Sequence, residues 1–145
     1  MEHTKRQNVN RGYMKLEVWN EAIQLFKFID DSIARINRID LRLRSQILDC
    51  AQSVSANIAE GYSRRTINEY LQFLNIALGS ASELMTRMIG LRITETIGTD
   101  SFEEFDKLHY SVENKLIKLA KALQSKRRTG AWEDEFRELR EVYKS

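Results

Sequence analysis

The chain has 145 residues, of which 42% are hydrophobic and 30% are charged, and its net charge is only +2. This balance excludes a fully disordered chain and provides one domain with enough apolar side chains for a core. The absence of proline and the count of 6 glycines favour long helices over many short strands.

The first part of the chain is polar and basic. Residues 1–15 contain Lys5, Arg6, Arg11 and Lys15 against the single acid Glu2, and they show no apolar periodicity. We predict a mobile basic arm at 1–15, followed by a helical domain at 16–128.

Two amphipathic helices are predicted next. Residues 16–35 carry an apolar stripe at three- and four-residue steps, and residues 40–60 carry a second one, with Asp40 as the expected N-cap. Gly61 follows the second stripe, at a position typical of a C-cap glycine in the left-handed conformation. The first stripe consists of Trp19, Ile23, Phe26, Ile29, Ile33 and Ile36, and the second of Leu43, Ile47, Ala51, Val54 and Ile58.

The third predicted helix, residues 67–96, begins with a capping-box pattern formed by Thr66 and Glu69. It is apolar around much of its circumference, which is typical of a helix that is buried on more than one side. No helix of a four-helix bundle is central, so this pattern favours an oligomer. Gly98 is predicted to end the helix.

A fourth helix is predicted to begin with Asp100 as its N-cap and to end near residue 128, with an apolar stripe that includes Phe105 and Leu116. The predicted fold is therefore all-α, an antiparallel up-down-up-down four-helix bundle. Residues 129–145 are predicted to form a short amphipathic helix. Its apolar side chains are candidate contacts to another subunit or a partner: Trp132, Phe136 and Leu139.

The sequence contains little that could support catalysis. It has 2 histidines, and neither belongs to the Glu-x-x-His pattern of di-iron bundles. Neither a phosphate-binding glycine loop nor a serine nucleophile elbow is present. We therefore expect a protein without catalytic residues, metal ligands or cofactor. No apolar run approaches the ~18 residues of a membrane span, so a cytoplasmic location without membrane contact is expected.

Small and polar residues cluster before and within the third helix. Ser53, Asn57 and Glu60 precede Gly61, and we favour hydrogen bonds across the bundle over a ligand pocket as their role. Gly79 and Ser80 lie inside the third helix, where a glycine costs ~1 kcal/mol relative to alanine. Close crossing against the second helix, or against another subunit, would explain this glycine.

Basic side chains are the only feature that suggests a class of partner. A solvated face and phosphate binding to RNA or DNA are both compatible with them, and an oligomer would multiply such contacts. The alternative function is a protein-interaction scaffold that docks a partner through the C-terminal amphipathic segment. The candidate nucleic-acid-binding residues are Arg42, Arg44, Arg64, Arg65, Lys107, Lys115, Lys118 and Lys121.

Three motifs resemble one known family. They are Leu16-x-Val18-Trp19-x-x-Ala22, the run from Ser53 through Asn57-Ile-Ala-Glu60-Gly61 to Tyr62, and Tyr70-Leu-x-Phe73-Leu-x-Ile76-Ala77-x-Gly79-Ser80. The chain resembles the four-helix-bundle proteins of the 23S rRNA-intervening sequence family. The resemblance implies a ring-like homopentamer without known catalysis.

A relative of this family, the accessory protein of diversity-generating retroelements, works beside a reverse transcriptase. Nucleic acid and a polymerase are therefore the partners that the resemblance implies. The sequence departs from the family at Ser55, where many members have proline, and at Asp49 and Cys50, in a region that is often basic.

Overall fold

The computed structural model describes residues 12–129. The C-terminal segment with Trp132, Phe136 and Leu139, and most of the predicted basic arm, lie outside the described residues. Within the described part, a short 3-10 helix, η1 (Gly12–Lys15), precedes four α-helices. These are α1 (Glu17–Ala34), α2 (Leu41–Tyr62), α3 (Ile67–Ile93) and α4 (Thr99–Thr129).

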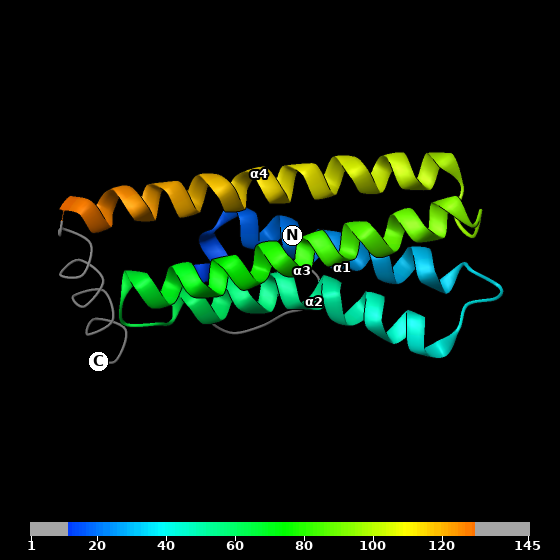
Figure 1. Ribbon diagram of the computed structural model, residues 1–145, viewed down its shortest axis with the longest axis horizontal. Helices are drawn as coiled ribbons and strands as arrows, with labels where there is room; N and C mark the ends of the chain where they lie inside the picture. Colours follow the sequence, from blue (N-terminus) through cyan, green and yellow to red (C-terminus); the bar gives the residue numbers. More distant parts are fainter. Residues whose placement is uncertain (1–11, 130–145) are drawn as a thin grey trace.

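Successive helices run in opposite directions and lie side by side (Figure 1). Each helix packs against two others: α1 on α2, α2 on α3, α3 on α4, and α4 back on α1. The connections are residues 35–40, 63–66 and 94–98. The prediction of an all-α fold with four-helix-bundle packing is confirmed for residues 12–129.

The core follows the axis of the bundle and contains large side chains such as Tyr70 and Phe105, which are 2% and 0% exposed. The predicted stripes of α2 and α4 face it. The stripe predicted for the first helix is confirmed at Ile29 and Ile33. Its first half was wrong by one residue, because α1 turns other side chains to the core there and leaves Trp19 and Phe26 only partly buried at the edge. The buried residues of α1 are Val18, Ala22, Leu25, Ile29 and Ile33.

Side-chain caps fix two of the helix starts. The Asp40 carboxylate accepts a hydrogen bond from the Leu43 amide at 2.9 Å, and the Thr66 hydroxyl accepts one from the Glu69 amide at 3.2 Å. Both satisfy amides that have no partner within the helix. The sequence predicted both caps.

The connection between α3 and α4 differs from the prediction. Helix α3 ends at Ile93 rather than near residue 96, and Glu95 adopts a left-handed φ of 58°. Helix α4 begins at Thr99, and the Phe102 amide donates to the Gly98 carbonyl at 3.1 Å. The prediction of Asp100 as the N-cap was therefore wrong, since this residue lies within the first turn.

Gly61 is not a C-cap, so that prediction was also wrong. Helix α2 continues to Tyr62, and Gly61 is buried within it against α3. A Cβ at Gly61 would lie 2.8 Å from the Phe73 Cβ and 3.0 Å from the Tyr70 Cδ1. The glycine is needed because α2 and α3 approach each other closely here.

Residues 12–15 were predicted as part of the arm, but the structure places them on the bundle as η1. This turn packs against α1 and α2. The Tyr13 ring makes edge contacts with the rings of Trp19 and Tyr62, at centroid distances of 5.4 and 6.5 Å. Aromatic packing therefore holds the chain to the bundle from Gly12 onward.

Candidate nucleic-acid interface

The four predicted arginines belong to two separate groups at opposite ends of the bundle (Figure 1), whereas the four predicted lysines lie along α4. Arg42 and Arg44 lie in the first turn of α2, whereas Arg64 and Arg65 follow its last turn. Helix α2 has 22 residues, so the groups are about 33 Å apart along the bundle. The four arginines therefore do not form one continuous basic surface.

The first group surrounds the connection between α1 and α2, and we call it the α1–α2 group. Its side chains are exposed, apart from a partly buried Arg44. The nearby acid Asp40 uses its carboxylate to cap α2. The group consists of Arg35, Arg38, Arg42 and Arg44.

The second group combines the α2–α3 connection with the C-terminal end of α4, and we call it the α4-end group. The Arg127 guanidinium donates a hydrogen bond to the Asn68 side-chain oxygen at 2.9 Å, which ties the end of α4 to the start of α3. Cations in the last turn of a helix are also favoured by the helix dipole. The group consists of Arg64, Arg65, Lys126, Arg127 and Arg128.

Sequence reasoning missed the three cations of α4 in this group. The run Lys126-Arg127-Arg128 is visible in the sequence. Its proximity to Arg64 and Arg65 depends on the antiparallel packing of α3 and α4, which brings together residues about 60 positions apart in the chain.

Arg64 is held in place more firmly than Arg65. Its guanidinium forms an ion pair with Glu60 at 2.7 Å and lies 4.6 Å from the centroid of the Phe73 ring. Arg65 is exposed. Arg65 is therefore the side chain of this connection that is best placed to reach an external anion.

The four candidate lysines of α4 do not share one role. Lys107, Lys118 and Lys121 are exposed. Lys115 instead lies between α4 and α1, with ion pairs to Glu21 at 2.6 Å and Glu17 at 3.2 Å. Its hydrogen bond to Glu21 and that to Glu17 raise the pKa of Lys115. Lys115 therefore joins two helices, and three lysines are available to solvent.

The predicted polar motif forms a seam between α2 and α3. The Ser53 and Ser80 hydroxyls are 2.8 Å apart, and the Asn57 amide donates to the Ser53 hydroxyl and carbonyl at 2.9 and 2.7 Å. Glu60 turns outward to Arg64. Of the three predicted residues, Ser53 alone bonds across to α3, whereas Asn57 bonds within α2 and Glu60 pairs with Arg64, which follows it.

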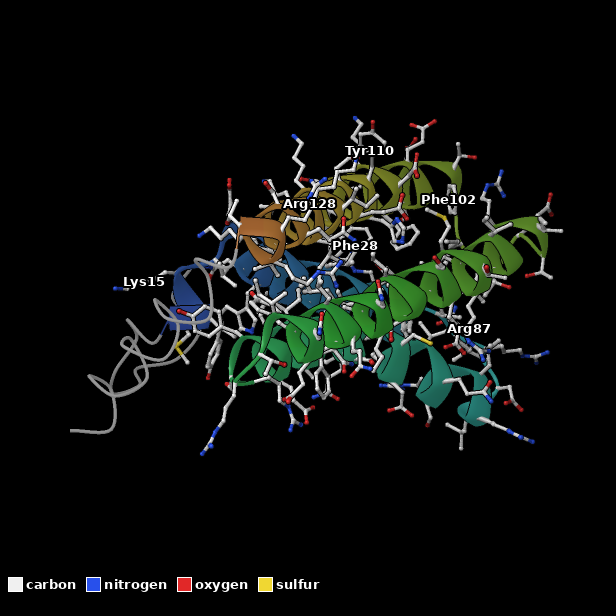
Figure 2. The ribbon with its side chains drawn as sticks, turned by 60° about the vertical axis from the view of Figure 1, so that its left-hand side comes forward. Lys15, Phe28, Arg87, Phe102, Tyr110 and Arg128 are labelled. Atoms are coloured by element: carbon white, nitrogen blue, oxygen red, sulfur yellow. The ribbon has the colours of Figure 1, made fainter. Side chains whose placement is uncertain are left out.

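A second polar cluster on the same seam was not predicted. Arg87 on α3 binds Glu83 through two nitrogens, at 2.9 and 3.3 Å, and reaches Gln46 on α2 at 3.0 Å (Figure 2). The hydrogen bond from Arg87 lowers the pKa of Glu83. Burial, and after it the interaction with Glu83, raises the pKa of the Cys50 thiol to about 11. Cys50 is therefore a packing residue with little thiolate at neutral pH.

Gly79 has no packing partner among residues 12–129. A Cβ at this position would meet nothing within 4 Å, so close crossing against α2 does not explain the glycine. Ile76 lies one turn earlier on α3 and is 50% exposed. Close crossing against α2 is therefore wrong as the explanation for this glycine, and contact with another subunit stays a prediction.

The described side chains form no cluster of three or more potential metal ligands. Among the helices that the structure describes, none is long and apolar enough to cross a membrane. His109, one of the two histidines, is buried, and its Nε2 lies 2.7 Å from the Ala81 carbonyl oxygen. This bond joins α4 to α3 and gives the ring a structural role.

Comparisons with known proteins place these features in context. The model of the family described as 23S rRNA-intervening sequence protein matches residues 14–118. No curated protein matches the chain significantly. A crystal structure of a protein of unknown function from the S23 ribosomal protein family of Bacteroides thetaiotaomicron is similar, with a TM-score of 0.67 and 23% sequence identity. The match covers 72% of this chain and 95% of that one, and at this identity it supports the fold alone.

Proposed function

The chain belongs to the 23S rRNA-intervening sequence protein family, and from that premise we propose that it is a non-catalytic, oligomeric module that binds nucleic-acid phosphates through its basic ends. The observation that carries the proposal is the α4-end group, in which five cations from two distant segments share one end of the bundle. Exposed guanidinium groups suit phosphate oxygens because they donate paired hydrogen bonds and keep their charge.

Phosphate contacts of this kind give affinity without selecting a base sequence. An open bundle end, rather than a deep pocket, is compatible with this mode of binding. We expect RNA and duplex DNA both to bind, with selectivity supplied by the shape of the nucleic acid or by a protein partner.

Self-association is the second part of the proposal, and the outer face of α3 supports it. Ile76 and Gly79 are exposed on this face, and the bare glycine allows a second backbone to approach closely. The resemblance to the family suggests five copies. Each added copy would bring another α4-end group to the same ligand.

The nucleic-acid proposal is tested by fluorescence anisotropy of a labelled RNA hairpin and a DNA duplex at about 50 and 200 mM salt. Five phosphate contacts predict that affinity falls by a factor on the order of 500 between the two salt concentrations. Arg65→Glu and Arg128→Glu should each weaken binding and reduce the salt dependence by about one contact or more.

The matched control is Lys27→Glu, which makes the same change of charge at an exposed position of α1 far from both groups. Absence of binding at the lower salt would refute the proposal. So would equal losses for Arg65→Glu and Lys27→Glu, because they would reflect net charge alone.

Self-association is tested separately by the molar mass of the full chain in solution. We expect an oligomer for the wild type and a smaller species for Ile76→Asp, whose side chain is exposed and so should not disturb the core. A monomeric wild-type protein would refute the proposal of self-association, and it would not affect the nucleic-acid proposal.

A further inference from the structure

A groove lies between the start of α2 and the end of α3, at the end of the bundle opposite the α4-end group (Figure 1). Its volume is about 360 Å³. Ile39, Leu43 and Leu91 give it an apolar lining, and Arg87 and Gly90 are the α3 residues beside them (Figure 2 labels Arg87). The groove is separate from the α3 face around Gly79 and from the seam of Ser53 and Ser80.

Unpartnered apolar surface continues beyond the groove. Leu41 and Ile93 are the most exposed large hydrophobic residues of the described chain, at 77% and 76%, and both adjoin lining residues in sequence. Gly90 leaves bare backbone at the groove, because a Cβ there would meet nothing within 4 Å. Apolar surface concentrated in this way is typical of an interaction site.

The surroundings of the groove are basic. Arg38, Arg42 and Arg44 of the α1–α2 group flank its α2 side in sequence, and the carboxylate of the lining residue Asp40 is occupied by the Leu43 amide. An apolar groove with basic surroundings fits an acidic amphipathic segment.

We propose that this groove binds residues 130–145 of a second copy of the chain. Trp132, Phe136, Leu139 and Tyr143 occur at steps of four, three and four, the spacing of one helical face. The segment contains five carboxylates against three cations, so its charge is opposite to that around the groove. The carboxylates are Glu133, Asp134, Glu135, Glu138 and Glu141, and the cations are Arg137, Arg140 and Lys144.

The length of the segment assigns it to another copy rather than to its own bundle. Helix α4 ends at Thr129 beside Asn68, as the bond from Arg127 shows, and Asn68 is 22 residues before Gly90 on α3. The groove is therefore about 33 Å from the end of α4, whereas 16 helical residues span about 24 Å. Trp132, only three residues beyond Thr129, cannot reach the groove of its own bundle while it lies on a helix with Phe136.

The contact uses neither the α4-end group, which carries the nucleic-acid proposal, nor the face around Gly79, although arginines of the α1–α2 group flank it. Copies joined through it would meet head to tail, with the basic α4 end of one bundle directed toward the α1–α2 group of the next.

The test measures binding of a fluorescein-labelled peptide of residues 130–145 to a full-chain receptor carrying Trp132→Ala and Phe136→Ala, whose own segments lack their main anchors. We expect saturable binding in the micromolar range that weakens at least tenfold with Gly90→Glu in the receptor. Gln24→Glu is the control, since it adds the same charge at an exposed position of α1 outside the groove, and it should leave peptide binding unchanged.

The wild-type full chain provides the second measurement. Its intact segments should compete with the peptide, and the competition should grow with protein concentration because it comes from other copies. Lack of peptide binding, equal effects of Gly90→Glu and Gln24→Glu, or competition that is independent of concentration would each overturn the proposal. Loss of nucleic-acid binding or of the α3 contact would not affect this result.

Discussion

Replacing Gly61 by alanine adds one methyl group where α2 and α3 approach most closely. The new Cβ would lie 2.8 Å from the Phe73 Cβ, 3.0 Å from the Tyr70 Cδ1 and 3.2 Å from the Tyr70 carbonyl oxygen. The first and last of these atoms belong to the backbone or are attached directly to it, so a rotamer change cannot relieve the overlap. The helices must move apart.

The expected change in the free energy of unfolding is the sum of two opposing contributions. Overpacking a core contact costs about 1–3 kcal/mol, and replacing glycine by alanine inside a helix returns up to about 1 kcal/mol. Gly79→Ala has only the second term, because a Cβ there meets nothing. We therefore expect Gly61→Ala to lower the free energy of unfolding by about 1–3 kcal/mol relative to Gly79→Ala.

Urea denaturation followed by far-UV circular dichroism measures this difference, at two protein concentrations so that any linkage to self-association is visible. Each kcal/mol corresponds to about 2–4 °C in Tm for a chain of this size. Equal stability of the two variants would refute the argument, since it would mean that the helices accommodate a methyl group at no cost.

Three further predictions concern the core and the seam. Phe105→Ala removes a side chain that is 0% exposed. It should lower the free energy of unfolding by about 3–5 kcal/mol in the same urea assay. A decrease below about 1 kcal/mol would show that Phe105 is not part of a tightly packed core. Ser80→Ala removes the partner of the Ser53 hydroxyl and should lower the free energy of unfolding by about 0.5–1.5 kcal/mol. The same substitution should have no effect on stability when Ser53 is already replaced by alanine. A decrease that persists in that background would contradict a direct hydrogen bond between the two hydroxyls. The pKa of the Cys50 thiol is raised to about 11. Cys50 should therefore react with a disulfide reagent at pH 8 far more slowly in the native protein than in the urea-unfolded protein. Equal rates in the two states would contradict the burial of Cys50.

The helices and two of their caps were predictable because the evidence for them is local. Apolar residues at three- and four-residue steps mark a helix wherever they occur, and Asp40 and Thr66 cap amides only three residues away. The rotation of α1 was not predictable in the same way. Two interleaved stripes, one through Val18 and one through Trp19, satisfy the same spacing, and the choice between them depends on what the neighbouring helices can accommodate.

Gly61 shows a second limit of local sequence. A glycine after an apolar stripe suits a C-cap and equally suits a close crossing, and the atoms that decide between them belong to Tyr70 and Phe73 on the next helix. The basic residues show the same limit over a longer range. Arg65 and Arg128 are 63 residues apart in the chain, and only the packing of α4 beside α3 places them at one end.

The separation of the two basic groups by the length of α2 sets a minimum size for any ligand that contacts both. The 22 residues of α2 span about 33 Å, which equals about ten base pairs of B-form duplex at 3.4 Å each. Shorter duplexes can occupy one end of a bundle at a time, so affinity should rise in a step near this length rather than smoothly. Ten base pairs are also about one helical turn, so both ends of a bundle lying along the duplex would face the same side of it.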